Sequence, residues 1–213
     1  MTLRLFDYWR SSAAYRVRIA LNLKGVAYEA VDTSLLHGEQ RDLAYLARNP
    51  QGLVPMLEVG DLRLTQSLAI IDWLDVAYPA PRLIPADPAV RAAELAKAMV
   101  VAADIHPINN LRILKYLKND LGQPQDAIDQ WARHWIAEGF AALEAMADAD
   151  APYLSGAAPG LADVFLVPQM ANARRVDTPL DPFPKLVAID ARATALAPFA
   201  KAHPDAVKPA RYV

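Results

Sequence analysis

The order of short apolar runs and amphipathic stretches in the first 80 residues constrains the fold more than any other feature of this chain. Residues 3–6 form a short strand candidate, and apolar residues at spacings of three and four then predict a helix from Ser11 through Lys24. Gly25 follows where helices commonly end in a left-handed residue. Residues 28–31 predict a second strand. A strand, a helix and a second strand favour a parallel pair with a right-handed crossover.

The next segment predicts a weak helix at residues 41–48, followed by a hairpin and a further helix. The hairpin pairs residues 54–59 with residues 62–65 through a Gly-Asp turn. The helix begins at Ser67 and keeps helical register to Tyr78. The complete order, β-α-β-α-β-β-α, is that of an α/β thioredoxin-like domain.

A proline-rich connector separates this part from the rest of the chain. Beyond the connector, alanine- and leucine-rich stretches carry helical periodicity and are interrupted at Pro107, at residues 122–124 and at residues 156–160. These interruptions predict five or six helices and no strand. We therefore expect a thioredoxin-like domain at residues 1–80, a linker at 81–88 and an all-α C-terminal domain at 89–213.

Composition argues against several classes of function. The 22 Lys and Arg residues against 24 Asp and Glu give a net charge of -2, without the basic excess that nucleic-acid binding requires. The chain has no cysteine, which excludes a disulfide scaffold, a cysteine nucleophile and thiolate metal ligands. His134 and Glu138 lie four residues apart, but no third ligand accompanies them, so we expect no metal site. We also expect no membrane partner and a cytoplasmic location, because the start does not resemble a signal peptide and no window of about 18 residues is uninterruptedly apolar.

Two pairs of residues stand at predicted helix starts and leave two interpretations open. Ser11 and Ser12 precede the first helix, and Gln66 and Ser67 begin a later one. Serine is a favoured N-cap. However, a helix N-terminus also attracts anions and lowers the pKa of a thiol placed there.

Four stretches resemble the zeta class of glutathione transferases, which includes maleylacetoacetate isomerase and the bacterial maleylpyruvate isomerases. They are SSAAYRVRIAL at residues 11–21, NPQGLVP at 49–55, QSLAII at 66–71 and VPQMANARR at 167–175. The resemblance extends from residue 3 to about residue 205. It implies the glutathione transferase fold, glutathione as cofactor, and a homodimer.

The resemblance also implies the residues of a glutathione site. Ser12, the second serine of the motif, would hydrogen-bond the thiolate of glutathione. Ser11 would lie beside Ser12 in the same site. Val54 would bind glutathione through its main chain, which a cis peptide at Pro55 turns outward in thioredoxin-like folds. Gln66 and Ser67 would bind the γ-glutamyl carboxylate. The further contacts implied by family position are Gln40, His106, Asn110, Leu111 and Arg112.

Two arginines match positions at which the family meets the carboxylates of a dicarboxylic substrate. They are Arg10 and Arg175, with Arg174 as the neighbouring alternative, because helix register decides which of that pair points inward. Ala13 stands where the family motif commonly carries a cysteine. No resident thiol therefore takes part in the expected mechanism.

The resemblance therefore predicts a glutathione-dependent cis–trans isomerase of a maleyl dicarboxylic acid. A thiolate would add to the cis double bond, the resulting single bond would rotate, and elimination would leave the trans product. Maleylacetoacetate, converted to fumarylacetoacetate, is the first choice of substrate. Maleylpyruvate is the second, since residues 106–110 also resemble the bacterial maleylpyruvate enzymes. A general conjugating transferase and a non-catalytic glutathione-transferase-like binding protein remain alternatives.

Overall fold

The computed structural model of this chain describes residues 2–212 and divides into two compact units. The first unit joins Met1–Leu83 to Ala195–Val213, and the second is Ile84–Thr194. The sequence-based expectation placed residues 195–213 with the helical domain, whereas their contacts group them with the α/β unit. No helix within residues 2–212 is both long enough and apolar enough to cross a membrane.

The first unit is built on a four-stranded sheet with the order β2-β1-β3-β4. Strand β1 (Leu3–Asp7) pairs with β2 (Tyr28–Asp32) in parallel, as predicted, and with β3 (Met56–Val59) in antiparallel. Strand β4 (Leu62–Thr65) completes the predicted hairpin with β3. Strand β3 begins two residues after its predicted start, at the residue that follows Pro55, and proline has no N–H to donate to a ladder.

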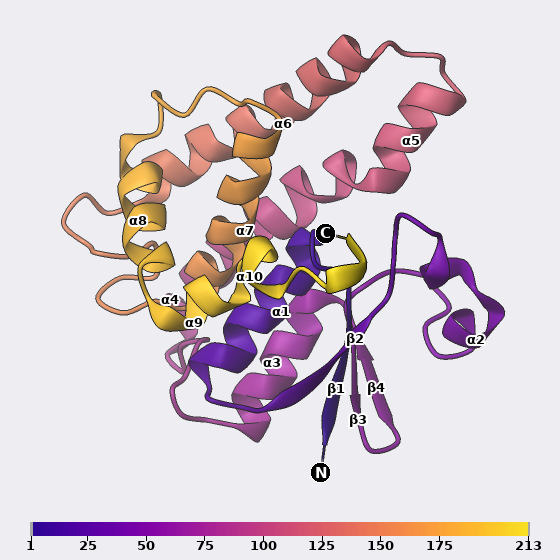
Figure 1. Ribbon diagram of the computed structural model, residues 1–213. Coiled ribbons are helices and arrows are strands. Elements are labelled where there is room, and N and C mark those ends of the chain that lie inside the picture. The colour runs from indigo at the N-terminus through magenta and orange to yellow at the C-terminus, as the bar shows by residue number, and fades with distance from the viewer. Residues whose placement is uncertain (1, 213) are drawn as a thin grey trace. The chain divides into compact units, whose positions relative to one another are not determined.

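Three helices accompany the sheet in the predicted order. They are α1 (Ser12–Leu23), α2 (Leu43–Leu46) and α3 (Ser67–Ala77). Helices α1 and α3 pack together on one side of the sheet, and α2 lies on the other (Figure 1). Helix α2 begins two residues later than predicted, after the 3-10 turn Glu39–Arg41, and ends two residues earlier.

Helix α1 is buried over most of its surface, because α9 covers the side that α3 leaves open. The predicted apolar face, which includes Val17 and Leu21, is fully buried. Arg18 is also buried, and its NH1 atom donates to both carboxylate oxygens of Asp7 at 2.7 Å. Its Nε atom donates to the carbonyl of Ala202 at 3.0 Å, and its NH2 atom to the carbonyl of Trp9 at 3.1 Å.

Helix α4 begins at Pro88, the last residue of the predicted linker, and α5 to α9 begin within the region in which the sequence predicts five or six helices. They are α4 (Pro88–Met99), α5 (Leu111–Asn119), α6 (Gln125–Met146), α7 (Leu161–Arg175), α8 (Pro184–Thr194) and α9 (Ala197–Ala202). Helix α10 (Pro204–Val207) and the 3-10 turn Ala210–Tyr212 follow. The interruption predicted at Pro107 is present, and it starts earlier with a π-helical turn at Val100–Ile105.

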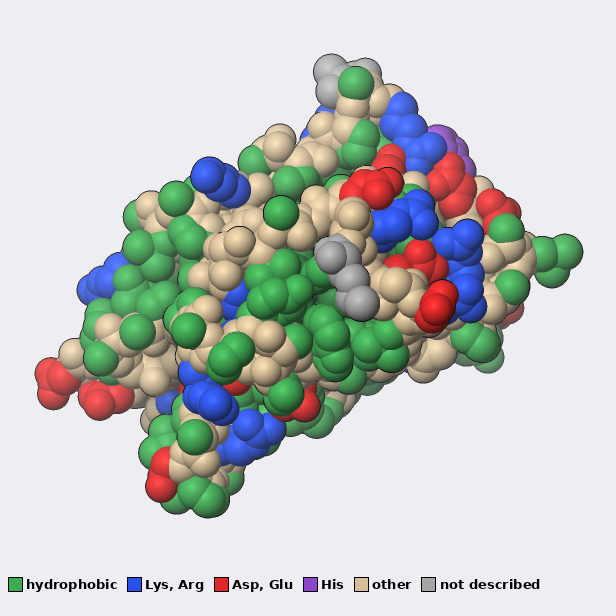
Figure 2. Space-filling model, turned by 90° about the horizontal axis from the view of Figure 1, so that it is seen from below, with side chains coloured by type: hydrophobic (Ala, Val, Ile, Leu, Met, Phe, Trp, Pro, Cys, Tyr) green, Lys and Arg blue, Asp and Glu red, His purple; other side chains and the backbone are tan. Residues whose placement is uncertain are grey.

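The second unit is organised around α7, which is buried along most of its length. Asp163 reaches back from the first turn of α7 and accepts hydrogen bonds from the N–H groups of Gly160 and Leu154 at 3.0 and 2.8 Å. Glu94 of α4 accepts another from the N–H of Ala162 at 2.7 Å. Asp163 therefore caps the start of α7, and Glu94 is a second acceptor there. On the face of the molecule shown in Figure 2, acidic and basic side chains are interspersed.

The buried pair between Arg18 and Asp7 leads to a stability prediction. Replacing Arg18 by Met leaves the Asp7 carboxylate buried without its partner, which costs about 3–5 kcal/mol in proteins. We expect the Arg18→Met protein to lose about that much free energy of unfolding in urea titrations. The exposed control Arg63→Met, which gives up only a 3.6 Å contact with Glu58, should change it by about 0.5 kcal/mol or less. Equal losses in the two variants would contradict a structural role for the buried pair.

Candidate active site

The two serines at the start of α1 have different roles. Ser11 is the N-cap, and its Oγ accepts a hydrogen bond from the N–H of Ala14 at 3.2 Å. Ser12 is the first helical residue and is half-buried, and no residue within 2–212 hydrogen-bonds to its hydroxyl. Both interpretations of the motif therefore have a place in the structure. Ser11 caps the helix, and the hydroxyl of Ser12 remains available at the positive end of the helix dipole.

Ser67 begins α3, and its hydroxyl oxygen accepts a hydrogen bond from a residue of α1. The NH1 atom of Arg16, one turn after Ser12, donates to Ser67 Oγ at 3.3 Å inside the protein. Because the guanidinium donates, Ser67 Oγ acts as the acceptor and its own O–H remains a donor. Burial lowers the pKa of Arg16 to about 9, so the group stays charged at neutral pH. The sequence analysis missed Arg16, although a charged residue on an otherwise buried helix face is a signal that could have found it.

Gln66 joins β4 to α3 in an unusual backbone conformation. Its φ is 68° and its ψ is 118°, in a region that residues other than glycine seldom occupy and that is concentrated at functional sites. Its Nε2 atom donates to Oε1 of Gln51 at 2.8 Å. Gln66 therefore contacts the loop that precedes the cis proline.

That loop confirms the cis peptide predicted at Pro55. The carbonyl of Leu53 accepts hydrogen bonds from the Tyr45 hydroxyl at 2.6 Å and from Asn49 Nδ2 at 2.7 Å, which fixes the residue before Val54. Within the described part of the chain, no hydrogen bond occupies the main chain of Val54. A second cis peptide, at Ala80–Pro81, was not predicted.

Gln40 lies against the same loop. Gly52 has a φ of 59°, and a Cβ atom there would come within 2.9 Å of the Gln40 carbonyl oxygen, so this approach requires glycine. The Oε1 atom of Gln40 is buried and has no hydrogen-bond partner among residues 2–212. A buried acceptor without a donor is costly and rare in native proteins, so it marks a place where a ligand donor fits.

The candidate residues of the second unit gather at the turn before α5. His106 follows the π-helical turn, and Asn110 is the N-cap of α5, where its Oδ1 accepts from the N–H of Arg112 at 3.2 Å. Leu111 and Arg112 are exposed in the first turn of α5. The neighbouring Asn109 was not predicted; its side chain is buried, and its amide has no partner in the described chain.

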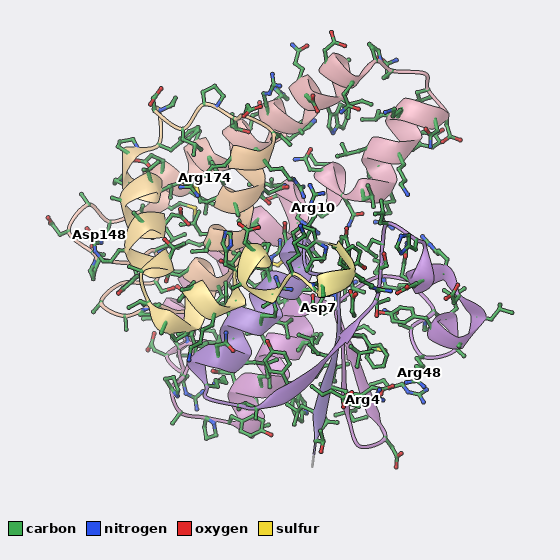
Figure 3. All side chains as sticks on the ribbon, in the orientation of Figure 1. Arg4, Asp7, Arg10, Arg48, Asp148 and Arg174 are labelled. Atoms are coloured by element: carbon green, nitrogen blue, oxygen red, sulfur yellow. The ribbon has the colours of Figure 1, made fainter. Side chains whose placement is uncertain are left out.

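Arg174 and Arg175, between which the sequence does not decide, make different contacts at the end of α7. Arg174, which is labelled in Figure 3, is paired with the buried Asp190 of α8, with 2.6 Å between its NH2 atom and Oδ2 of Asp190. Arg175 is exposed, and its guanidinium donates to the side chain of Asn172. In the first unit, Arg10 is exposed with its guanidinium carbon 5.5 Å from the centre of the Trp9 ring. Arg174 therefore has a structural partner in Asp190, and Arg10 has no partner of opposite charge within 4 Å among the described residues.

The structure shows no metal-binding arrangement in residues 2–212. No group of three or more His, Asp or Glu side chains comes together there. His134 and Glu138 are 3.7 Å apart on exposed turns of α6 and form an ordinary pair one helical turn apart.

Comparisons with known proteins place this chain in a family. Residues 1–76 match the model of the glutathione S-transferase N-terminal domain. The chain is 50% identical over 208 residues to a probable maleylacetoacetate isomerase of Vibrio cholerae, covering 96% of this chain and 97% of that one. The holo structure of a maleyl pyruvate isomerase, a bacterial zeta-class glutathione S-transferase, matches with a TM-score of 0.94 and 46% identity over 96% of this chain and 98% of that one.

A third relative carries ligands. The maleylacetoacetate isomerase of Anaeromyxobacter dehalogenans, solved with dicarboxyethyl glutathione and citrate in its active site, is 44% identical with a TM-score of 0.86. The match covers 98% of this chain and 97% of that one. These likenesses confirm the glutathione transferase fold predicted from the sequence, and the chain belongs to the zeta-class glutathione transferase family.

Proposed function

We propose that this protein is a glutathione-dependent cis–trans isomerase of a maleyl dicarboxylic acid. The observation that carries the proposal is the dicarboxyethyl glutathione in the active site of the relative from Anaeromyxobacter dehalogenans. That ligand joins the glutathione sulfur to a short chain with two carboxylates, as thiol addition to a maleyl acid would. Bound glutathione would supply a thiolate that adds to the cis double bond, lets the bond rotate and leaves as the trans acid forms.

The polar groups of the α/β unit fit glutathione. The tripeptide offers amide donors, carboxylates and a thiol, and the unit presents a matching group for each. The buried Gln40 Oε1 lacks a donor, the Val54 main chain is unpaired within the described residues, and Ser12 and Ser67 each have a hydroxyl proton to donate. No cysteine of the chain competes with the thiol of glutathione, since Ala13 occupies the motif position.

Ser12 would stabilise the thiolate. Its hydroxyl would donate to the sulfur at the N-terminus of α1, where the helix dipole also favours negative charge. Ser11 already caps the helix, so this hydrogen bond would not compete with capping.

Ser67 and Gln66 would bind the γ-glutamyl carboxylate at the N-terminus of α3. Arg16 supports this assignment because its guanidinium donates to Ser67 Oγ, which leaves the Ser67 O–H as a donor, and adds positive charge beside it. From the second unit, His106, Asn110, Leu111 and Arg112 would contact the tripeptide.

Arg10 and Arg175 would bind the carboxylates of the maleyl acid. A guanidinium donates two parallel hydrogen bonds to one carboxylate, which suits a dicarboxylic substrate. The pairing of Arg174 with Asp190 favours Arg175 over its neighbour for this role.

Maleylacetoacetate is the proposed substrate, and maleylpyruvate is the second candidate because the relative with a TM-score of 0.94 is a maleyl pyruvate isomerase.

We further propose a cytoplasmic homodimer. Residues 1–80 would bind glutathione, residues 81–88 would form the linker, and the helices within residues 89–194 would bind the acid, since residues 195–213 group with the first unit.

The decisive assay adds maleylacetoacetate to the glutathione-free protein with and without glutathione. Fumarylacetoacetate should form only with glutathione, whereas conjugation of a chlorinated aromatic acceptor without isomerisation would indicate a general transferase.

A thiolate role for Ser12 predicts a specific effect of removing its hydroxyl. Ser12→Ala should raise the pKa of the bound thiol and lower kcat/KM by about 10- to 150-fold, the loss of one hydrogen bond to a charged group. The thiol pKa is measured from the ultraviolet absorbance of the bound thiolate. The control Ser11→Ala removes a cap and should instead cost about 1 kcal/mol of stability. A bound-thiol pKa that is the same in Ser12→Ala and in the parent protein would remove Ser12 from the mechanism.

The carboxylate clamp predicts a loss confined to the dicarboxylic substrate. Arg10→Met and Arg175→Met should each lower kcat/KM for the maleyl acid by about 10- to 150-fold and leave glutathione affinity little changed. Arg174→Met is the matched control, which should lose stability through Asp190 but keep its activity. The assignment is wrong if Arg174→Met loses the isomerase activity that Arg175→Met keeps.

A further inference from the structure

The last residues of the chain fold back against two loops of the α/β unit. Arg211 donates from Nε to Oδ2 of Asp32 at 2.5 Å, and from NH1 and NH2 to the two carboxylate oxygens of Glu39 at 2.8 and 3.1 Å. Asp32 ends β2, and Glu39 begins the 3-10 turn that contains Gln40. One guanidinium therefore joins the two ends of the loop between β2 and Gln40.

Glu39 is fixed from the other side as well. Its Oε2 atom accepts a hydrogen bond from the N–H of Ser34 at 2.6 Å, so the carboxylate closes the loop on itself while it binds Arg211. The hydrogen bond from Arg211 lowers the pKa of Glu39, so the carboxylate is charged at neutral pH. The position of Gln40, the next residue, follows from the position of Glu39.

Aromatic contacts extend the same segment to the loop before α1. The Tyr212 ring lies 6.3 Å from the ring of His37 at an interplanar angle of 18°, and 5.9 and 6.0 Å from the rings of Tyr8 and Trp9. Lys208 Nζ lies 5.3 Å from the centre of the Trp9 ring. Residues 8 and 9 directly precede Arg10, Ser11 and Ser12, so the C-terminal residues contact two of the segments that carry first-unit candidates, the loop before α1 and the loop before Gln40.

We infer that residues 208–212, here named the C-terminal strap, hold these two loops in the geometry that glutathione binding requires. Arg211 and Tyr212 are positioning residues, which act through Glu39 on Gln40 and through Trp9 on the start of α1. The inference rests on the proposed function, because Gln40 and Ser12 are proposed glutathione contacts. It assigns a role to the C-terminal segment, which the sequence analysis placed in the other domain.

The strap is tested by glutathione binding to the full-length protein, measured by calorimetry after bound glutathione is dialysed away. Arg211→Met should raise the dissociation constant of glutathione by about 1.5- to 5-fold, the range for partly exposed ion pairs. At saturating glutathione, kcat should stay close to that of the parent protein, because positioning before binding affects KM and not the chemical step. Tyr212→Ala should act in the same direction, and Arg211→Lys should recover part of the affinity by restoring the charge.

Hydrogen exchange of the glutathione-free protein gives a second measurement. Amides of residues 33–41 should exchange faster in Arg211→Met than in the parent protein, while those of α7 and α8 keep their protection. Arg63→Met is the matched control, since Arg63 is an exposed arginine of the same unit that contacts Glu58 rather than the loops. It should change neither glutathione affinity nor exchange in the loop.

The outcomes separate the strap from the proposed function. A parent protein that does not bind glutathione overturns the proposed function, and the strap inference falls with it. A parent protein that binds, together with an Arg211→Met variant that binds equally well, overturns the strap alone. A loss of kcat in proportion to affinity, or equal effects in Arg63→Met, would show a general loss of stability and would also overturn the strap.

Discussion

Arg18 joins four parts of the α/β unit through one buried guanidinium. It binds the Asp7 carboxylate at the end of β1, the Trp9 carbonyl in the following loop and the Ala202 carbonyl at the end of α9, while its own backbone belongs to α1. A buried charge must keep its partners, because an unpaired one is expensive in the protein interior. The direction of α1 against β1 therefore depends on this contact, and so does the position of Ser12 at the start of the helix.

Helix α1 contributes to both of the proposed anion sites. Its first residue offers a hydroxyl where the helix dipole is positive, and one turn later Arg16 supports Ser67 at the start of α3. The proposed thiolate and carboxylate contacts are therefore spaced by the packing of two helices rather than by flexible loops. Ser11 makes this arrangement stable, because it caps the helix without using Ser12.

Local patterns predicted the order of strands and helices in the α/β unit, because each element depends on residues close together in the sequence. The resemblance to thioredoxin-like folds predicted the cis peptide at Pro55. Features that depend on distant partners were not predictable. The ion pair between Arg174 and Asp190 depends on the packing of α8 against α7, and it is this packing that distinguishes Arg174 from Arg175. The grouping of residues 195–213 with the first unit likewise follows from α9 packing on α1, which no spacing in the sequence indicates.

The chain leaves the α/β unit after Leu83 and returns to it at Ala195, so the first unit is discontinuous in sequence (Figure 1). This has a consequence for biosynthesis. The guanidinium of Arg18 obtains the Ala202 carbonyl, and α1 obtains its cover from α9, only after the whole helical unit has been translated. Domains usually fold in the order in which they leave the ribosome. Here the unit that emerges first is completed last, and a nascent chain exposes one side of α1 until α9 has left the ribosome.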